Sequence, residues 1–170
     1  MDIVIKKMET DEEKRGKAYV HWKSWQEAYP GIVSQEFLDN LSIEKCEKWA
    51  FDYPDNTLVA KDGEKVVGFV AYGKNRWEDE LEDSGEIYAI YILSDYYGTG
   101  VGAKLMQAGL DEIPDCKKVA VRVLKENARA IKFYEKLGFQ FDGTEFDDDT
   151  LQAKEVRMVK NACYNSVAHL

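Results

Sequence analysis

Three glycines alternate along the stretch YYGTGVGAKL, at positions 98, 100 and 102, directly before a run with helical periodicity. A glycine weakens regular structure by roughly 0.5–1 kcal/mol relative to alanine, so this spacing needs a reason. One reason is a tight turn that requires positive φ. The other is a ligand that lies against bare backbone. The N–H groups at a helix start carry partial positive charge and suit a phosphate.

The common nucleotide-binding motifs fit this stretch poorly. The mononucleotide loop GxxxxGK[ST] is absent from the sequence, and the glycine spacing is GxGxG rather than the GxGxxG of the dinucleotide fingerprint. A dinucleotide-binding fold would also be expected to begin with its βαβ unit, whereas these glycines follow half of the chain. The phosphate, if one binds here, belongs to another kind of ligand.

Periodicity predicts the elements that position these glycines. Strand-like segments are 3–8, 57–61, 65–72, 86–93, 118–124, 139–146 and 151–160. Helical segments are 10–29, 34–41, 42–51, the run after the glycines and the run from Asn127 to Gly138. Thr10 is a good N-cap for the first helix, and Asp62-Gly63 marks a hairpin. This order predicts one mixed α/β domain with a sheet of six or seven strands.

Composition excludes several classes of protein. A chain of 170 residues, 45% hydrophobic and 32% charged, is long enough for one folded domain. No apolar run is long enough for a membrane span or a signal peptide, so we expect a cytoplasmic protein with no membrane partner. The net charge of −9 argues against a nucleic-acid partner. Three scattered cysteines and two histidines predict neither a disulfide framework nor a metal site.

Two motifs together carry a resemblance to a known family. IYILSDYYGTGVGAKLM resembles the pyrophosphate-binding motif of the GCN5-related N-acetyltransferases (GNAT), whose centre is written [QR]xxGx[GA]. NARAIKFYEKLGF is similar to that family's second cofactor motif, N-x-x-A-x-x-F-Y-x-x-x-G-F, at every fixed position. The resemblance extends over roughly residues 3–160. Tyr97 departs from it, because the family usually has glutamine or arginine there.

The resemblance implies a fold and a cofactor site. It implies one domain over residues 1–160 with a C-terminal tail over 161–170, a mixed sheet splayed between two parallel central strands, and about four flanking helices. The pantetheine arm of acetyl-CoA would enter the gap between strands 86–93 and 118–124, and its pyrophosphate would lie on the glycine turn. The implied cofactor contacts are Ile92, Leu93, Tyr97, Gly98, Thr99, Gly100, Val101, Gly102, Ala103, Asn127 and Tyr134.

One of these contacts, Asn127, has a second interpretation, and another, Tyr97, differs from the residue types usual in the family. Asn127 matches the asparagine that contacts the cofactor arm in the family, but it can also serve as a helix N-cap, and the two roles can coexist. Tyr97 in place of glutamine or arginine removes one polar contact, on the order of 1 kcal/mol. Because most of the implied phosphate contacts come from backbone, we expect binding to survive.

The resemblance also implies catalytic roles. Tyr134 matches the tyrosine that often lies beside the thioester sulfur, where a phenol of pKa about 10 can protonate the leaving thiolate. Its alternative role is a core tyrosine beside Phe133 and Leu137. The acceptor amine must lose a proton before it attacks. Glu86, which opens the central strand, is the predicted base, and its alternative is a strand-end surface carboxylate. No cysteine is placed for a covalent intermediate, so we expect direct attack.

The acceptor region implied by the family comprises WQEAYPGIV, WEDELEDSGE and EFDDDT, with Trp25, Tyr29, Trp77 and Tyr88 as predicted substrate-binding residues. The carboxylates of WEDELEDSGE and EFDDDT would attract a cation such as a polyamine or a basic peptide terminus. The alternative is that these stretches are simply solvated loops. The sequence thus predicts an acetyl-CoA-dependent N-acetyltransferase acting on a primary amine. The alternatives are a non-catalytic acyl-CoA sensor and an interaction module, and strand edges could support a homodimer.

Overall fold

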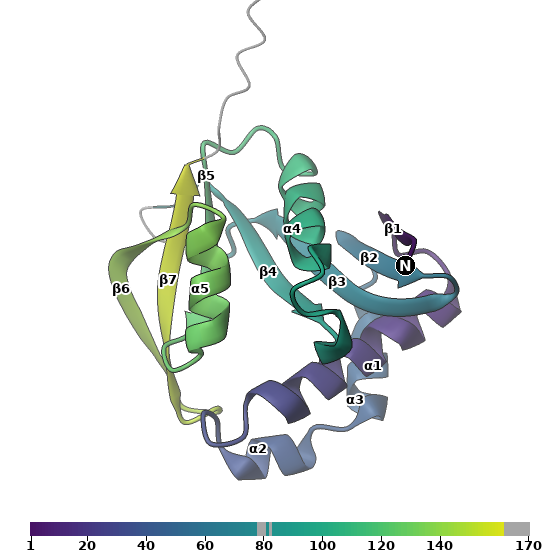
Figure 1. Cartoon of the computed structure of the whole chain (residues 1–170). Helices are drawn as coiled ribbons and strands as arrows, with labels where there is room; N and C mark the ends of the chain where they lie inside the picture. The colour runs from purple at the N-terminus through teal and green to yellow at the C-terminus, as the bar shows by residue number, and fades with distance from the viewer. Residues whose placement is uncertain (78–80, 82, 162–170) are drawn as a thin grey trace, which may run out of the picture.

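The computed structural model describes residues 1–77, 81 and 83–161, which fold around one seven-stranded sheet (Figure 1). Its strands, in the order β1-β2-β3-β4-β5-β7-β6, pair antiparallel except for the parallel pair β4–β5. Their bounds are β1 Ile3–Lys7, β2 Thr57–Asp62, β3 Lys65–Lys74, β4 Gly85–Ile92, β5 Lys118–Leu124, β6 Gln140–Asp148 and β7 Ala153–Asn161. The predicted mixed sheet with a parallel central pair is confirmed.

The described part of the chain contains five α-helices and one short 3₁₀ helix, against about four helices expected. They are α1 Asp11–Ala28, α2 Gln35–Asn40, α3 Ile43–Asp52, η1 Ser94–Tyr96, α4 Val101–Asp111 and α5 Ala128–Lys136. None of these helices is long and apolar enough to cross a membrane. The predicted tail began at residue 161, but Asn161 is still paired in β7, and residues 162–170 lie outside the described part.

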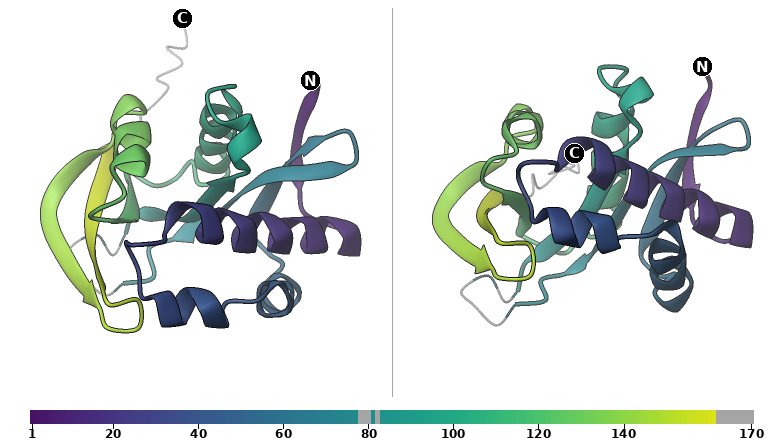
Figure 2. Two further views of the ribbon diagram at one scale, coloured as in Figure 1. Left: turned by 60° about the horizontal axis from the view of Figure 1, so that its bottom comes forward. Right: turned by 90° about the horizontal axis from the view of Figure 1, so that it is seen from below.

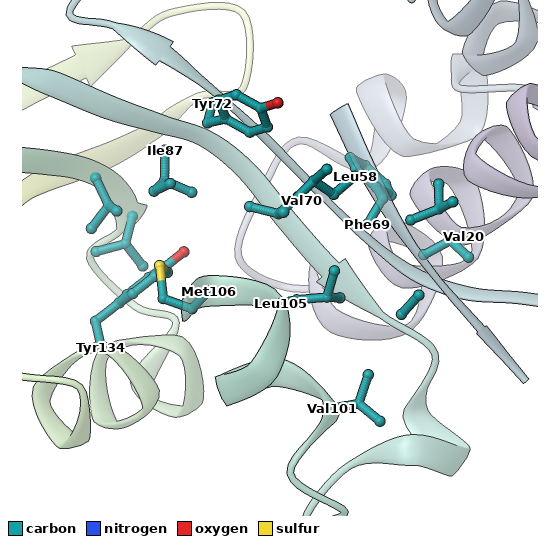
Figure 3. Close-up of a cluster of buried hydrophobic side chains, with 14 of the residues drawn as sticks. Val20, Leu58, Phe69, Val70, Tyr72, Ile87, Val101, Leu105, Met106 and Tyr134 are labelled. Carbon is teal, nitrogen blue, oxygen red and sulfur yellow. The ribbon is translucent and has the colours of Figure 1, made fainter. Parts of the chain in front are cut away.

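The helices cover the two faces of the sheet separately (Figures 1 and 2). Helices α4 and α5 lie on one face, and α1, α2 and α3 lie on the other. The main core is formed by apolar side chains of the strands together with α4, Tyr134 of α5 and, on the other face, Val20 of α1 (Figure 3). Phe69, Leu105 and Met158 are among its fully buried members. Both central strands are therefore covered on both faces, as their apolar composition predicts.

A bulge in β4 changes which of its side chains face α1. Tyr72 pairs with Ile87 and Ala71 pairs with Ala89, so Tyr88 is an extra residue in β4. Ile87 points toward Gly109 of α4, which places Glu86 on the opposite face. Tyr91 lies on that same opposite face, where its ring stacks on His21 of α1. The bulge thus brings Glu86 and Tyr91, five residues apart, to one face.

Strands β4 and β5 separate soon after they meet. They pair only at Gly85 with Val119 and at Glu86 with Ala120. Beyond that point β5 stays paired with β7 along its whole length, while β4 stays paired with β3. Figure 1 shows the two strands diverging from their shared end. One edge of β4 therefore lacks a strand partner over most of its length, as the predicted splay requires.

Glu13 holds the N-terminal elements together. The predicted N-cap Thr10 is confirmed, and Glu13 completes a capping box by accepting from the backbone N–H of Thr10. The Glu13 carboxylate, buried from solvent, also accepts from Lys6 Nζ and from the N–H of Glu9, each at 2.8 Å. Burial alone would raise the pKa of Glu13, but these bonds outweigh it and lower the pKa to about 2.

Replacing Glu13 by glutamine should therefore destabilise the fold, by about 2 kcal/mol at neutral pH, because the charge-assisted bonds are lost. A lowered native-state pKa contributes stability above the ordinary pKa of 4.5, and this contribution is lost as the pH falls toward about 2. Urea unfolding near neutral pH and in acid measures this difference, which should shrink in acid. Glu12→Gln, at an exposed neighbouring position, is the control. An equal loss in both variants would refute the assignment.

Candidate active site

The glycine turn has both of the properties that its sequence allowed. Gly98 and Gly100 have φ of +73° and +88°, and a Cβ at either position would meet nothing within 4 Å. At Gly102 a Cβ would lie 2.9 Å from Ile92 Cδ1 and 3.0 Å from Phe133 Cε2. The first two glycines are required by backbone conformation and leave open space above the turn. The third permits close packing of α4 against β4 and α5.

Backbone N–H groups at the start of α4 are available to an anion. Gly100 is the N-cap of this helix, and no side chain caps it. Lys104 N–H makes the first helical bond, to Gly100 O, so the N–H groups of Val101, Gly102 and Ala103 precede the helical ladder. The helix dipole adds partial positive charge there. The start of α4 can therefore accommodate a phosphate.

Two of the predicted phosphate donors are used within the turn itself. Tyr97 N–H donates to Ser94 O at 3.1 Å, and Thr99 N–H donates to Tyr96 O at 3.4 Å. Contacts from Tyr97 and Thr99 would therefore have to come from their side chains or carbonyl groups. The role of these residues at the cofactor remains a prediction, as it does for the rest of the turn.

Arg129 is a cation at this turn that the sequence reasoning missed. Its guanidinium lies 3.4 Å from the centroid of the Tyr97 ring, so the first turn of α5 touches the glycine turn before α4. Stacking on an aromatic ring leaves the edge of a guanidinium free to meet a phosphate. The family usually has glutamine or arginine at the position of Tyr97. In this chain, an arginine from α5 lies against the tyrosine at that position. No spacing in the sequence indicated this contact.

Some of the residues predicted to contact the cofactor at the gap between β4 and β5 already make hydrogen bonds within the protein. Leu93 N–H donates to Val67 O at 2.9 Å, which leaves only its carbonyl and side chain for a ligand. Ile92 ends the unpaired edge of β4. Asn127 Oδ1 accepts from Ala130 N at 3.2 Å, so its predicted N-cap role is confirmed. Its contact with a cofactor remains a prediction.

Tyr134 is a buried residue of the main core, on the side of α5 that faces the sheet (Figure 3). Its ring packs edge-on against Phe133 and Phe139, with centroid separations of 5.5 and 5.7 Å. Burial, with a smaller contribution from Tyr91, raises the pKa of Tyr134 far above its usual value. The hydroxyl therefore stays protonated at neutral pH. Such a group can donate a proton but cannot serve as a base.

Two predicted acceptor residues form an aromatic cluster around Tyr91. Tyr29 Oη donates to Tyr91 Oη at 3.3 Å, and the Trp25 and Tyr29 rings are 4.8 Å apart at 75°. Burial raises the pKa of both Tyr29 and Tyr91. Tyr91 also raises the pKa of Tyr134, and Tyr134 raises that of Tyr29, so the three hydroxyl groups belong to one region. Trp25 and Tyr29 are thus brought together, and their role in binding an acceptor remains a prediction.

Glu86, the predicted base, is held by other groups. Its carboxylate is buried, and it accepts from Arg76 Nη2 at 2.9 Å, Arg76 N at 3.1 Å and Arg76 Nε at 3.3 Å. Trp77 Nε1 adds a fourth donor at 3.4 Å. Glu86 is therefore not a surface carboxylate, and taking up a proton would weaken several bonds at once. Its role as a base remains a prediction.

The other two predicted acceptor residues lie beside Glu86 rather than beside Tyr29. Tyr88 donates from Oη to Lys74 O at 2.7 Å, and the Arg76 guanidinium lies 4.1 Å from its ring centroid. Trp77 lies 3.6 Å from the guanidinium of Arg122, which also lies 3.4 Å from the ring of Phe146. These residues form a second, cation-rich group on the same face of the sheet. Arg122 was not singled out by sequence.

A cavity of about 440 Å³ lies beyond these groups, where the β6–β7 turn meets the α1–α2 connection. Ser34 N–H donates to Leu151 O at 2.8 Å and ties the two segments together. The lining of the cavity includes Ile32, Glu126, Asp147, Asp148, Asp149 and Lys154. The EFDDDT stretch therefore lines a real cavity. Residues 78–80 and 82, from the predicted WEDELEDSGE stretch, lie outside the described part.

The two cysteines in the described part of the chain are free thiols. Burial raises the pKa of Cys46 to about 11, and burial also raises the pKa of Cys116. Both therefore resist forming the thiolate that nucleophilic catalysis needs. Cys163 lies outside the described residues. These properties favour direct attack on the thioester over a cysteine-bound intermediate.

The sequence model of the Acetyltransferase (GNAT) family matches residues 19–139. The chain belongs to this family. GNAT proteins use acetyl-CoA as the acyl donor, and the matched range contains both cofactor motifs, the glycine turn and Tyr134. Family membership agrees with the splayed strands and the uncapped start of α4.

Relatives within the GNAT family include enzymes with named acceptors. The spermine/spermidine N(1)-acetyltransferase of Bacillus subtilis is 32% identical over 97 residues, which are 54% of this chain and 64% of that protein. An uncharacterized N-acetyltransferase of Archaeoglobus fulgidus is 32% identical over 112 residues, 64% of this chain and 76% of the relative. The match thus spans less than two thirds of the Bacillus enzyme.

Solved structures share the GNAT fold over nearly the whole chain. The PaiA N-acetyltransferase of Thermoplasma acidophilum, crystallised with coenzyme A, has a TM-score of 0.72 at 22% identity, covering 95% of this chain and 99% of that one. PH1933 of Pyrococcus horikoshii has a TM-score of 0.73 at 24% identity, covering 94% and 98%. At this level of identity the likeness establishes the fold alone.

Proposed function

We propose that this GNAT protein is an acetyl-CoA-dependent N-acetyltransferase that moves the acetyl group to a primary amine by direct attack on the thioester. The observation that carries the proposal is that three structural features lie along the gap between β4 and β5. The uncapped start of α4 lies at the open end of the β4–β5 splay, the unpaired edge of β4 runs along it, and the buried Tyr134 lies on α5 beside it.

Each of these features has a task in binding the donor. The N–H groups that open α4, with Arg129 beside them, would hold the pyrophosphate. The unpaired edge of β4 offers backbone groups to the amides of the pantetheine arm, much as a neighbouring strand would. Asn127 contributes its side-chain amide from the start of α5. The binding groups are spread along the gap, so the thioester would be oriented at its inner end.

Tyr134 would act as the general acid. As the neutral amine nitrogen bonds to the carbonyl carbon, the C–S bond breaks, and the Tyr134 hydroxyl gives its proton to the departing sulfur. The resulting phenolate would take back a proton from the nitrogen of the newly formed amide. The raised pKa of Tyr134 keeps the phenol fully protonated until the step begins. No covalent intermediate on the protein is needed.

We propose a polyamine-like acceptor. Three consecutive carboxylates, Asp147, Asp148 and Asp149, line the cavity beyond the tyrosine cluster. Lys154 pairs with Asp147 at 2.7 Å, which leaves the other two charges to attract a cation. The net charge of −9 adds long-range attraction. The name of the Bacillus relative, a spermine/spermidine acetyltransferase, supports the same choice, and a basic peptide terminus is the second candidate.

The acceptor class is tested by comparing acceptors that differ in charge. We expect kcat/KM for spermidine to exceed that for hexylamine, a single-charged amine of similar reach, and the difference to shrink as salt screens the carboxylates. Short peptides with a lysine-rich N-terminus form the second arm. Equal rates for spermidine and hexylamine at all salt concentrations would contradict a polycationic acceptor.

Arg129 should contribute to donor binding. Arg129→Ala is expected to raise KM for acetyl-CoA about tenfold, since one charge-assisted phosphate contact is worth about 1.5 kcal/mol at an exposed site. We expect kcat to stay close to that of the unmodified protein. Lys136→Ala, which removes a cation at the far end of the same helix, is the control for net charge. Initial rates at varied acetyl-CoA measure both constants. An unchanged KM in Arg129→Ala would refute this role.

A further inference from the structure

Glu155 of β7 lies on the same face as the tyrosine cluster. It pairs with Leu124 of β5 on one side and with Phe146 of β6 on the other. Its neighbour Val156 points into the main core, so Glu155 points to the opposite face of the sheet. Leu124, directly opposite, packs in one cluster with Tyr29 and Tyr91. The strand pairing therefore brings the Glu155 carboxylate beside this cluster.

Charged groups from several elements act on Glu155. Burial raises its pKa, and Asp148 of β6 and Glu86 of β4 raise it further. Arg122 of β5 and Arg76, which follows β3, oppose this shift. In turn, Glu155 raises the pKa of Tyr29 and Tyr91. Glu155 thus lies between the aromatic cluster and the cation-rich group, and it interacts electrostatically with both.

Glu155 and Glu86 differ in the hydrogen bonds and ion pairs that their carboxylates make. Within residues 1–77, 81 and 83–161, no hydrogen bond or ion pair engages the Glu155 carboxylate, whereas four donors hold Glu86. Glu155 is half-buried, so it is not sealed in the core. A base must take up a proton without breaking other bonds, and it must be reachable by the substrate. Glu155 meets the first requirement, and its partial exposure is compatible with the second.

We propose that Glu155 is the group that takes the proton from the acceptor's ammonium, directly or through one water, before the amine attacks. This inference rests on the proposed function. The carboxylate gains one proton, and the amine keeps its lone pair and forms the C–N bond. The second proton of the nitrogen goes to the Tyr134 phenolate, and Glu155 releases its proton to solvent. The raised pKa of Glu155 supports the assignment, because a stronger base removes the proton more readily.

The test is the pH profile of kcat/KM for Glu155→Gln. We expect a loss of about 100-fold near neutral pH, the low end for general base catalysis. The variant's rate should then rise by about tenfold per pH unit toward the pKa of the acceptor amine, because solution must supply the neutral amine. The unmodified protein should instead reach its plateau at lower pH. A weakly basic acceptor, trifluoroethylamine, should restore most of the loss in Glu155→Gln.

Glu86→Gln tests the rival assignment, in which Glu86 is the base. It removes the ion pair with Arg76 and a charge that raises the pKa of Glu155, so we expect a lower Tm and a profile that keeps its plateau but is displaced toward lower pH. Loss of the plateau in Glu86→Gln with an unchanged profile in Glu155→Gln would overturn the proposal and assign the base to Glu86. Parallel profiles for all three proteins would also overturn it. Failure of the unmodified protein to transfer acetyl groups at any pH would instead overturn the proposed function.

Discussion

Tyr134→Phe should lower kcat for acetyl transfer by about 100-fold to 1,000-fold, the range typical of a lost general acid. The substitution removes one oxygen from a buried ring and leaves the packing against Phe133 and Phe139 in place. The thiolate would then have to leave without a proton from the protein. Because the phenol acts on the departing sulfur rather than on the bound donor, KM for acetyl-CoA should change by less than about threefold.

Tyr72→Phe separates this chemical effect from the loss of a buried hydroxyl. Tyr72 is also buried in the main core, and its hydroxyl donates at 3.3 Å to Glu112, the C-cap residue of α4. Burial raises the pKa of Tyr72 to about 12, so both phenols are protonated at neutral pH. We expect Tyr72→Phe to lose about 1 kcal/mol of stability with kcat unchanged. Equal kcat in the two variants would remove the catalytic role from Tyr134.

Gly100→Ala should weaken binding of coenzyme A by about tenfold to 100-fold, which corresponds to the loss of one charge-assisted contact. The φ of +88° at this N-cap is unfavourable for any side chain, so the turn must shift to accept a Cβ. A shift there moves the N–H groups of Val101 and Gly102, which we assign to the pyrophosphate. Calorimetric titration with coenzyme A measures the change in Kd.

Gly143→Ala is the matched control for backbone strain. Gly143 has a φ of +87°, and a Cβ there also meets nothing within 4 Å. It lies in β6, away from the start of α4, so the two substitutions should cost similar stability, about 1–2 kcal/mol. Only Gly100→Ala should change Kd. Equal affinities for coenzyme A in both variants would show that the turn does not bind the pyrophosphate.

Much of the fold follows from local patterns in the sequence. The strand 118–124 was predicted with the bounds that β5 has, and the Asp62-Gly63 turn joins β2 to β3 as expected. Thr10 and Asn127 cap the helices that they were predicted to cap. These features depend on a few neighbouring residues, so local propensity and capping decide them.

The parts that escaped prediction depend on contacts between distant segments. The bulge at Tyr88 reverses the alternation of β4, and nothing in EIYAIYIL marks where the extra residue falls. Arg129 meets Tyr97 only because α5 packs beside the glycine turn. Glu155 alternates with buried Val156 and so has the pattern of a solvent-facing residue, although it faces the tyrosine cluster. Helix and strand periodicity identifies the face of each residue but not what covers that face.

The proposed reaction is transfer of an acetyl group from acetyl-CoA to a primary amine. It is tested most directly by incubating the purified protein with acetyl-CoA and spermidine and measuring free coenzyme A thiol and N-acetylated product together. We expect both to form in equal amounts, with both much reduced in Tyr134→Phe. Tight binding of acetyl-CoA without thiol release for spermidine, hexylamine or the peptides would contradict it and favour a non-catalytic acyl-CoA sensor.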